Sequence, residues 1–273
     1  MPEMPEVETI ARKLRRTIVG KSIAEVRLSG LPLRRPVGND FAQSLVGKTI
    51  RRIHRRGKYL IAEMEPKSFW VIHLGMSGRV FYFVDPSETP KHTHATIRFS
   101  DSSEVQYRDH RRFGLLTAYE VTRLGKIPEI GLLGKDPLDP GFTAAWLQPL
   151  LRRSRQEIKP FLLDQHKIAG LGNIYVCESL YQARVRPHRR CRSLTDYEIR
   201  SLVRSIRRVI RLAVRNRGTT FSDFMDSDGE LGTNQDFLWV FQKEGEKCRR
   251  CRTPIRRLRQ GTRSSFYCPG CQR

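Results

Sequence analysis

The sequence predicts an α+β, multidomain fold, in which a β-sandwich with flanking helices precedes a mainly helical domain and a small module built on four cysteines. Three observations predict this order. The 273 residues are enough for about two domains of ~150 residues each. Short β-rich runs occupy the first half of the chain, and helical periodicity dominates the second. Two Cys-x2-Cys pairs stand at the carboxy-terminal end.

The first domain is predicted at residues 1–126. It opens with an amphipathic helix, because apolar residues from Val7 to Ile18 recur at helical spacing and Pro5 suits a first helical position. Several β-rich runs then follow, separated by Gly, Pro, Asp and Ser. They include Tyr59 to Ala62, Trp70 to Leu74, Val80 to Val84, Ala95 to Phe99 and Val105 to Arg108. A β-sandwich fits this pattern best.

Prolines and glycines accumulate after Ile127, which predicts a linker or hinge at residues 127–150. The second domain, residues 151–240, is predicted to be mainly α, since an apolar stripe at helical spacing runs from Ile199 to Val214. Between Arg184 and Arg217, twelve arginines accompany only two acidic residues, Asp196 and Glu198. Solvated helix faces are often charged, but seldom so one-sidedly.

The last segment, residues 241–273, has the spacing of a zinc finger. Its Cys-x2-Cys-x16-Cys-x2-Cys pattern consists of Cys248, Cys251, Cys268 and Cys271. With four protein ligands no coordination position remains for water, so the single Zn²⁺ is expected to fix shape and not to perform chemistry. The basic stretch between the pairs favours DNA or RNA contact over a merely structural knuckle. Cys177 and Cys191 are expected to be buried thiols.

The composition describes a strongly basic protein. Lys and Arg number 51 against 28 Asp and Glu, a formal net charge of +23, so the expected partner is a polyanion. No apolar stretch reaches the ~18 residues of a membrane span. Acidic residues at Glu3, Glu6 and Glu8 stand where a signal peptide would be basic. We therefore expect a cytoplasmic protein without membrane association.

A tight turn, Gly170-Leu171-Gly172-Asn173, separates two helical runs, Ile158 to Leu163 and Ile174 to Gln182. Asn173 is placed to cap the second helix, whose free N–H groups and dipole favour an anion such as a backbone phosphate. An ordinary capped helix is the alternative interpretation of this tetrapeptide.

The amino terminus could be reactive. Removal of Met1 would leave Pro2 with a free secondary amine, and an α-amino group titrates near ~8, whereas a lysine titrates near ~10.4. Attack of this amine on a sugar C1′ gives an iminium, from which elimination of the 3′ phosphate can follow. Glu3 could donate a proton if its site is dry, and Glu6, one turn further, could orient it. The alternative is that Pro2 and Glu3 are only a frayed terminus and an acid at the start of a helix.

Several segments together form a recognisable set: Pro2 to Thr9, Gly57 to Tyr59, His73 to Gly78, Asp109 to Gly114 and Gly172 to Tyr175. With the terminal cysteines, they resemble the formamidopyrimidine-DNA glycosylase family, also called 8-oxoguanine DNA glycosylase. The resemblance runs nearly end to end, with the motifs in the same order. It implies a β-sandwich, a helix–two-turn–helix α domain and a zinc finger.

The resemblance also implies catalytic roles. Pro2 would be the Schiff-base nucleophile, and Glu3 would protonate the deoxyribose ring oxygen. Lys58 and Arg263 would donate protons in the two eliminations that cut the strand, although both could be ordinary phosphate clamps. The implied activity is excision of oxidised purines from double-stranded DNA, followed by β,δ-elimination at the abasic site. We expect a monomer that is associated with the nucleoid.

Further residues would contact DNA by resemblance: His92, Arg111, Arg153 and Asn173. Arg152 and Arg155 are equally basic neighbours of Arg153. Met76, Arg111 and Phe113 would fill the gap left by a base turned out of the duplex. Patterning alone favours Met76 and Phe113 as core residues instead. The stretch from Thr219 to Gln235 resembles the mobile loop over the extruded purine.

Two departures from the family pattern leave the chemistry alone. Met4 replaces a more usual leucine, which conserves volume, and the charge of +23 predicts tight, salt-dependent nonspecific DNA binding. Two alternatives stay open. An endonuclease VIII-like enzyme would release oxidised pyrimidines. The gap-filling set of Met76, Arg111 and Phe113, called the wedge residues below, and the continuation Val7-Glu8-Thr9 favour the formamidopyrimidine branch instead. A non-catalytic zinc-finger DNA-binding protein would retain Met1, which intact mass would reveal.

Overall fold

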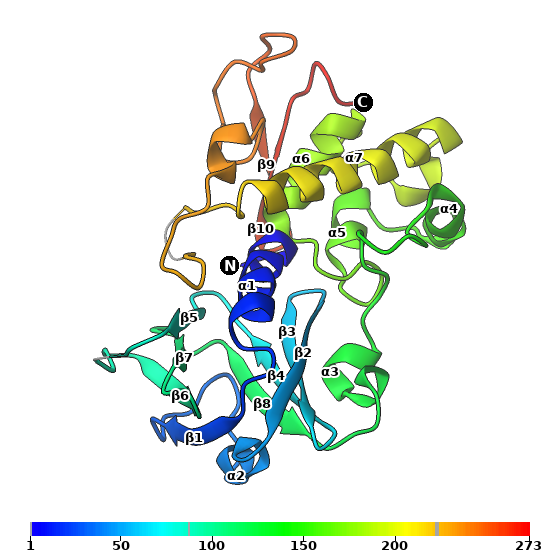
Figure 1. Cartoon of the computed structure of the whole chain (residues 1–273). Helices are drawn as coiled ribbons and strands as arrows, with labels where there is room; N and C mark the ends of the chain where they lie inside the picture. Colours follow the sequence, from blue (N-terminus) through cyan, green and yellow to red (C-terminus); the bar gives the residue numbers. More distant parts are fainter. Residues whose placement is uncertain (1, 87, 222–223) are drawn as a thin grey trace. The chain divides into compact units, whose positions relative to one another are not determined.

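The computed structural model describes residues 2–86, 88–221 and 224–273 (Figure 1). The chain forms two compact units. One comprises Met1–Leu132 and Asn216–Thr233, and the other comprises Leu133–Arg215 and Asn234–Arg273. In the described part of the chain, no helix is both long and apolar enough to cross a membrane.

The first unit contains two antiparallel four-stranded sheets, ordered β2-β3-β4-β8 and β1-β6-β7-β5. The strands are β1 (Ile23–Leu28), β2 (Thr49–Arg56), β3 (Tyr59–Glu65), β4 (Ser68–His73), β5 (Arg79–Phe83), β6 (Thr93–Phe99), β7 (Glu104–Arg108) and β8 (Leu115–Tyr119). Side chains from both sheets meet in one apolar core, with Leu60 and Ile72 from one sheet and Ile97 and Val105 from the other. This confirms the predicted sandwich and each predicted strand.

Helix α1 (Met4–Thr17) opens the first unit as the sequence predicts, with a proline in its first turn. Its apolar stripe, including Val7, Ile10 and Leu14, is buried in the sandwich core. Short helical segments complete this unit: α2 (Phe41–Leu45), η1 (Leu124–Lys126) and α3 (Pro128–Gly131).

The second unit is helical, with a two-stranded hairpin near its end. Its helices are α4 (Ala144–Arg153), α5 (Ile158–Leu163), α6 (Asn173–Ala183), η2 (Cys191–Ser193), α7 (Asp196–Arg215) and η3 (Asn234–Phe237). The hairpin pairs β9 (Arg256–Gln260) with β10 (Arg263–Tyr267) between the two cysteine pairs. Helix α7 buries Ile199, Leu202 and Ile206, while Arg204 and Arg208 are exposed. The predicted helical runs are thus confirmed.

The segment Asn216–Thr233 belongs to the first unit, although it lies within the predicted range 151–240. Long-range backbone contacts hold it there, since Thr219 N–H donates to Glu6 and Tyr82 N–H donates to the Ser227 carbonyl at 3.0 Å. In addition, α3 and most of α4 form within the predicted linker 127–150. The boundaries near residues 126, 150 and 240 stay predictions.

Candidate functional site

The amino-terminal residues are buried and fixed. Pro2 is buried, and Glu3 is only 2% exposed at the amino-terminal end of α1. A capping box joins Glu3 and Glu6, in which each side chain accepts the other residue's backbone N–H. The terminus is therefore not frayed at Pro2 and Glu3, whereas Glu3 does stand at the start of the helix, as the alternative interpretation expects.

Glu6 binds two stretches of the first unit at once. One carboxylate oxygen accepts Glu3 N–H at 2.8 Å, and the other accepts Thr219 N–H at 2.7 Å. Gly218 has a φ of +84°, and a β-carbon there would lie 2.9 Å from Glu6 Cγ. Only glycine fits this position without displacing the carboxylate. The carboxylate of Glu6 thus holds the backbone of Glu3 and that of Thr219, which is consistent with the predicted orienting role of Glu6.

The segments Gly57–Tyr59 and His73–Gly78 meet at one end of the sheet. Tyr59 pairs with His73 across β3 and β4, and their ring centres are 4.7 Å apart. Lys58, in the turn that precedes β3, is only 7% exposed. Burial, with the nearby positive charges of Lys58 and Arg34, lowers the pKa of His73 to about 4. His73 is therefore neutral at pH 7, and its Nδ1 accepts Gly75 N–H at 3.0 Å.

We expect His73 to make the protein less stable in acid. In the unfolded chain it binds a proton near pH 6.5, whereas in the folded protein it stays neutral until about pH 4. Stability should therefore fall as pH decreases through this window, by up to roughly 3 kcal/mol. Denaturant unfolding between pH 7 and 4 measures it. His73→Asn should remove that part of the slope, and replacing the exposed His110 by Asn should retain it; equal slopes in both variants would contradict the assignment.

Asp109 fastens the Asp109–Gly114 turn to the neighbouring His73–Gly78 segment. It is 1% exposed, and one carboxylate oxygen accepts Ser77 Oγ–H at 2.5 Å and Arg111 N–H at 3.2 Å. The other oxygen accepts Gly114 N–H at 2.8 Å and the Tyr107 hydroxyl at 3.2 Å. Sequence reasoning named neither Asp109 nor Ser77 as a site residue. Both residues nevertheless lie within motifs that carry the family resemblance, Asp109 to Gly114 and His73 to Gly78.

The three predicted wedge residues project from these two joined segments. Met76 is 38% exposed and Phe113 is 46% exposed, so the alternative that both are core residues is wrong. The Arg111 guanidinium lies 4.8 Å from the Phe113 ring centre. A β-carbon at Gly75 would lie 2.4 Å from the Phe113 carbonyl, so glycine permits the close approach of the two segments. The exposed His92 is beside them, since its carbonyl accepts Asp109 N–H at 3.0 Å.

In the second unit, Asn173 does not cap its helix as predicted. Gly172 is the capping residue, and Asn173 is the first residue of α6. Its side chain turns to the hairpin, where Nδ2 donates to the Ser264 carbonyl at 3.0 Å. Its buried Oδ1 has no partner among the described residues. Asn173 and Arg263 line the same cavity of about 560 Å³.

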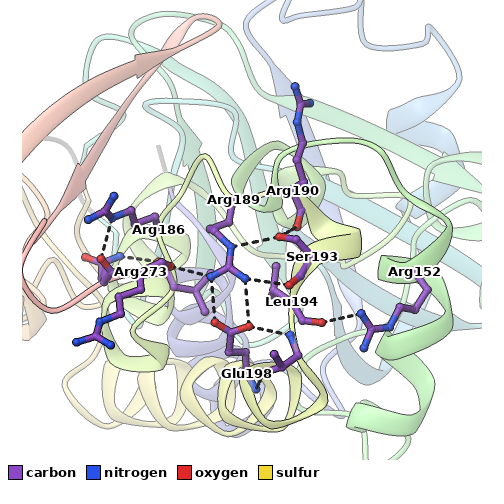
Figure 2. A network of polar contacts seen from close by, with 11 residues as sticks. Arg152, Arg186, Arg189, Arg190, Ser193, Leu194, Glu198 and Arg273 are labelled. Atoms are coloured by element: carbon purple, nitrogen blue, oxygen red, sulfur yellow. Dashed lines mark hydrogen bonds and ion pairs between the residues drawn. The ribbon is translucent and has the colours of Figure 1, made fainter.

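Lys159 and Arg152 each make hydrogen bonds within the second unit. Lys159 is fully buried, and its Nζ donates to the Ser264 carbonyl and the Ser265 hydroxyl, both at 2.7 Å. Arg152 binds the Asp196 carboxylate at 2.6 Å. It also donates to the Leu194 carbonyl at 2.8 Å (Figure 2). Arg153 is exposed at the end of α4. The guanidinium group of Arg152 is thus engaged in contacts within the protein, whereas its neighbour Arg153 is exposed.

The four predicted zinc ligands lie together. Their sulfur atoms are all within 4.8 Å of one another, and Cys251 Sγ is 3.4 Å from both Cys268 Sγ and Cys271 Sγ. Four thiolates at such spacing fit a tetrahedral Zn²⁺, whose Zn–S distances are about 2.3 Å. The remaining cysteines, Cys177 and Cys191, are buried thiols as expected.

A buried acid that sequence reasoning missed anchors the segment before the zinc module. Glu178, on α6, is 2% exposed and accepts the backbone N–H groups of Trp239, Val240 and Phe241 at 2.9–3.0 Å. An acid on an otherwise apolar helix carries no local signal of this role, because its partners are some sixty residues away.

Three family models match successive parts of the chain. Residues 1–116 match the formamidopyrimidine-DNA glycosylase N-terminal domain, residues 133–225 match the formamidopyrimidine-DNA glycosylase H2TH domain, and residues 245–273 match the zinc finger found in FPG and IleRS. The chain belongs to the formamidopyrimidine-DNA glycosylase family. It is therefore an enzyme of the DNA glycosylase class, with one structural zinc.

Family relatives align over the whole chain. The formamidopyrimidine-DNA glycosylase of Pelotomaculum thermopropionicum is 40% identical, over 100% of this chain and 99% of the relative. Among solved structures, Lactococcus lactis Fpg with abasic-site DNA is 34% identical, with a TM-score of 0.90 over 99% of each chain. The MutM (FPG) protein of Thermus thermophilus is 36% identical, with a TM-score of 0.88 over 99% of this chain and 98% of that one.

Proposed function

We propose that this glycosylase excises oxidised purines, 8-oxoguanine and formamidopyrimidines, from double-stranded DNA and then cleaves the abasic strand by β,δ-elimination. The observation that carries the proposal is the buried Pro2 beside a Glu3 that is fixed by the capping box. A terminal amine held in place next to a carboxyl group has both a nucleophile and a proton donor. Structural relatives bound to DNA with an abasic site or a Fapy-dG lesion support this substrate class.

The reaction begins after removal of Met1. The Pro2 nitrogen attacks C1′, and Glu3 protonates the deoxyribose ring oxygen as the bond between C1′ and that oxygen breaks. The glycosidic bond then breaks, the base leaves with the proton that the Pro2 nitrogen loses, and C1′ and the nitrogen form the iminium. The iminium acidifies the C2′ hydrogens, so loss of the 3′ phosphate and then of the 5′ phosphate cuts the strand on both sides. Lys58 and Arg263 supply protons to these eliminations or bind the phosphates.

Recognition uses the exposed residues of both units. Met76 and Phe113 occupy the vacated space in the duplex, and the Arg111 guanidinium hydrogen-bonds the orphaned base. Their exposure on joined turns supports this role. His92, Arg153 and Asn173 contact the DNA backbone, and the described part of 219–235 covers the extruded purine. A DNA substrate and four thiolates together support a cytoplasmic, nucleoid-associated location.

Borohydride trapping tests the proposal. Incubation with duplex carrying 8-oxoguanine should give one covalent adduct, which peptide mapping assigns to Pro2. The matched control is the same chain with Met1 retained, which should release little base and form no adduct. An adduct that maps only to a lysine would refute the mechanism.

Lesion class requires a separate assay. Duplexes with 8-oxoguanine or thymine glycol, compared under single-turnover conditions, should show release of the purine in preference to the pyrimidine. Exclusive release of thymine glycol would instead support the endonuclease VIII-like alternative.

A further inference from the structure

The second unit carries a basic groove at the far end of α6 from Asn173. Its volume is about 1310 Å³, and it lies between α7, the carboxy-terminal end of α6 and the cysteine pairs. Five arginines line it: Arg184, Arg204, Arg208, Arg250 and Arg273. Helix α6 is 11 residues long, or ~15 Å at ~1.5 Å per residue. The groove is therefore separate from the cavity that holds Asn173 and Arg263.

The arginines of the groove are only partly neutralised by the fold. The side chains of Arg204 and Arg208 are exposed one turn apart on α7, and they form no ion pair within the described ranges. Glu198 is the acidic side chain in the lining, and Arg189 binds both of its oxygens at 3.0 and 3.2 Å (Figure 2). Thr195 N–H also donates to Glu198 at 2.7 Å. Cys251 and Cys271 of the four-cysteine cluster also line the groove, so the thiolates offset part of the charge of its five arginines, and the exposed Arg204 and Arg208 carry the positive charge on the α7 side.

An apolar pocket of about 310 Å³ continues the groove. It shares Gln182, Arg208 and Arg250 with the groove, and its floor consists of aliphatic and aromatic side chains. These include Val209, Leu212, Phe237, Leu238 and Trp239. Phe237 is 48% exposed, so the pocket opens to solvent beside the arginines.

The apolar part of the pocket suits an aliphatic or phenyl side chain, and its larger ring, Trp239, is already covered. Base recognition by stacking needs a free aromatic face. The Trp239 ring already stacks on Tyr181 at 5.8 Å, and the guanidinium groups of Arg249 and Arg250 lie 5.6 and 5.4 Å from its centre. Val209, Leu212 and Leu238 are the aliphatic members of the lining, Phe237 is half-exposed beside them, and Glu178, Gln182, Asn234 and Arg208 are polar.

We propose that this groove binds a short acidic peptide segment of a partner protein, with its carboxylates on Arg184, Arg204 and Arg208 and one apolar side chain in the adjoining pocket. Guanidinium groups bind carboxylates through paired, charge-assisted hydrogen bonds. An apolar anchor next to such pairs gives a short segment a defined register. The peptide and DNA bind at opposite ends of α6, so the enzyme can hold both.

The test uses the zinc-loaded full chain and a labelled peptide of four aspartates followed by Leu-Phe. Fluorescence anisotropy at ~150 mM salt, where the Debye length is about 8 Å, limits the contribution of distant charges. We expect a Kd on the order of 1–100 μM. Arg204→Glu with Arg208→Glu should weaken binding at least tenfold, and Leu212→Gln should weaken it severalfold. Glycosylase activity and zinc content verify folding.

The matched control is Arg200→Glu with Arg211→Glu, which changes the charge of the same helix equally at exposed positions outside the groove. It should alter the Kd less than threefold. Equal weakening by both double variants would overturn the site, as would unchanged binding of a peptide whose Leu-Phe is replaced by Ser-Ser. An oligothymidine of equal charge that binds more tightly with the same dependence on Arg204 and Arg208 would show a nucleic-acid site instead.

Discussion

Replacement of Glu3 by Gln is expected to slow release of 8-oxoguanine by about 10²–10⁴-fold, the usual contribution of a general acid. Gln has nearly the same shape and can still accept the Glu6 N–H in the capping box, so the fold is retained. It cannot donate the proton that the ring oxygen needs. Single-turnover release from lesion duplex measures the loss. Borohydride trapping on a duplex with a preformed abasic site should decline far less, because that substrate has no base to expel.

Glu8→Gln is the matched control for this experiment. Glu8 lies on the same helix and is also largely buried, but its carboxylate pairs with Arg15 and Arg55. The substitution weakens a structural contact, so release should fall less than tenfold. If base release and abasic-site trapping decreased together in Glu3→Gln, the residue would be structural and the proposed role would fail.

Loss of zinc is expected to weaken the binding of duplex DNA strongly. Cys268 is fully buried in a small core with Ile255, Phe266 and Tyr181, and a four-thiolate module of this size depends on its metal for folding. Cys268→Ser should lose the zinc and weaken duplex binding by at least about 100-fold, since the hairpin that carries Arg263 loses its support. Metal analysis and fluorescence anisotropy with duplex DNA measure the two effects.

Cys191→Ser separates loss of a thiol from loss of the metal. Cys191 is buried but stands apart from the four-sulfur cluster. This variant should retain one zinc per chain and bind DNA with the affinity of the unaltered protein. Full zinc occupancy and unchanged binding in Cys268→Ser would contradict the role assigned to the metal site.

Local patterns in the sequence predict elements well here. The alternation of β-rich runs with Gly, Pro and Asp predicts strands that the structure contains, and the spacing of apolar residues predicts α1 and α7. The four cysteines were also assigned from spacing alone, because two close pairs leave little freedom in how a tetrahedral metal can be held.

Contacts between distant residues were not predictable in this way. Asn173 was expected to cap a helix, but the Ser264 carbonyl, 91 residues away, takes its amide instead. Asp109 and Glu178 have their roles because backbone N–H groups converge on them, and such convergence leaves no periodic signal in the chain. Patterning placed Met76 and Phe113 in the core, and the family resemblance alone pointed to the exposed positions that they occupy.

The two oxygens of Glu6 have a consequence for motion. They connect the backbone of Glu3 with that of Thr219, which is 213 positions beyond Glu6. Segments that share a buried carboxylate open as one cooperative unit, because releasing either segment leaves a buried carboxylate oxygen without its hydrogen bond. Release of the backbone at Thr219 and loosening of the first turn of α1 are thus expected to occur together. Pro2, whose nitrogen is the proposed nucleophile, is thereby coupled to the backbone at Thr219.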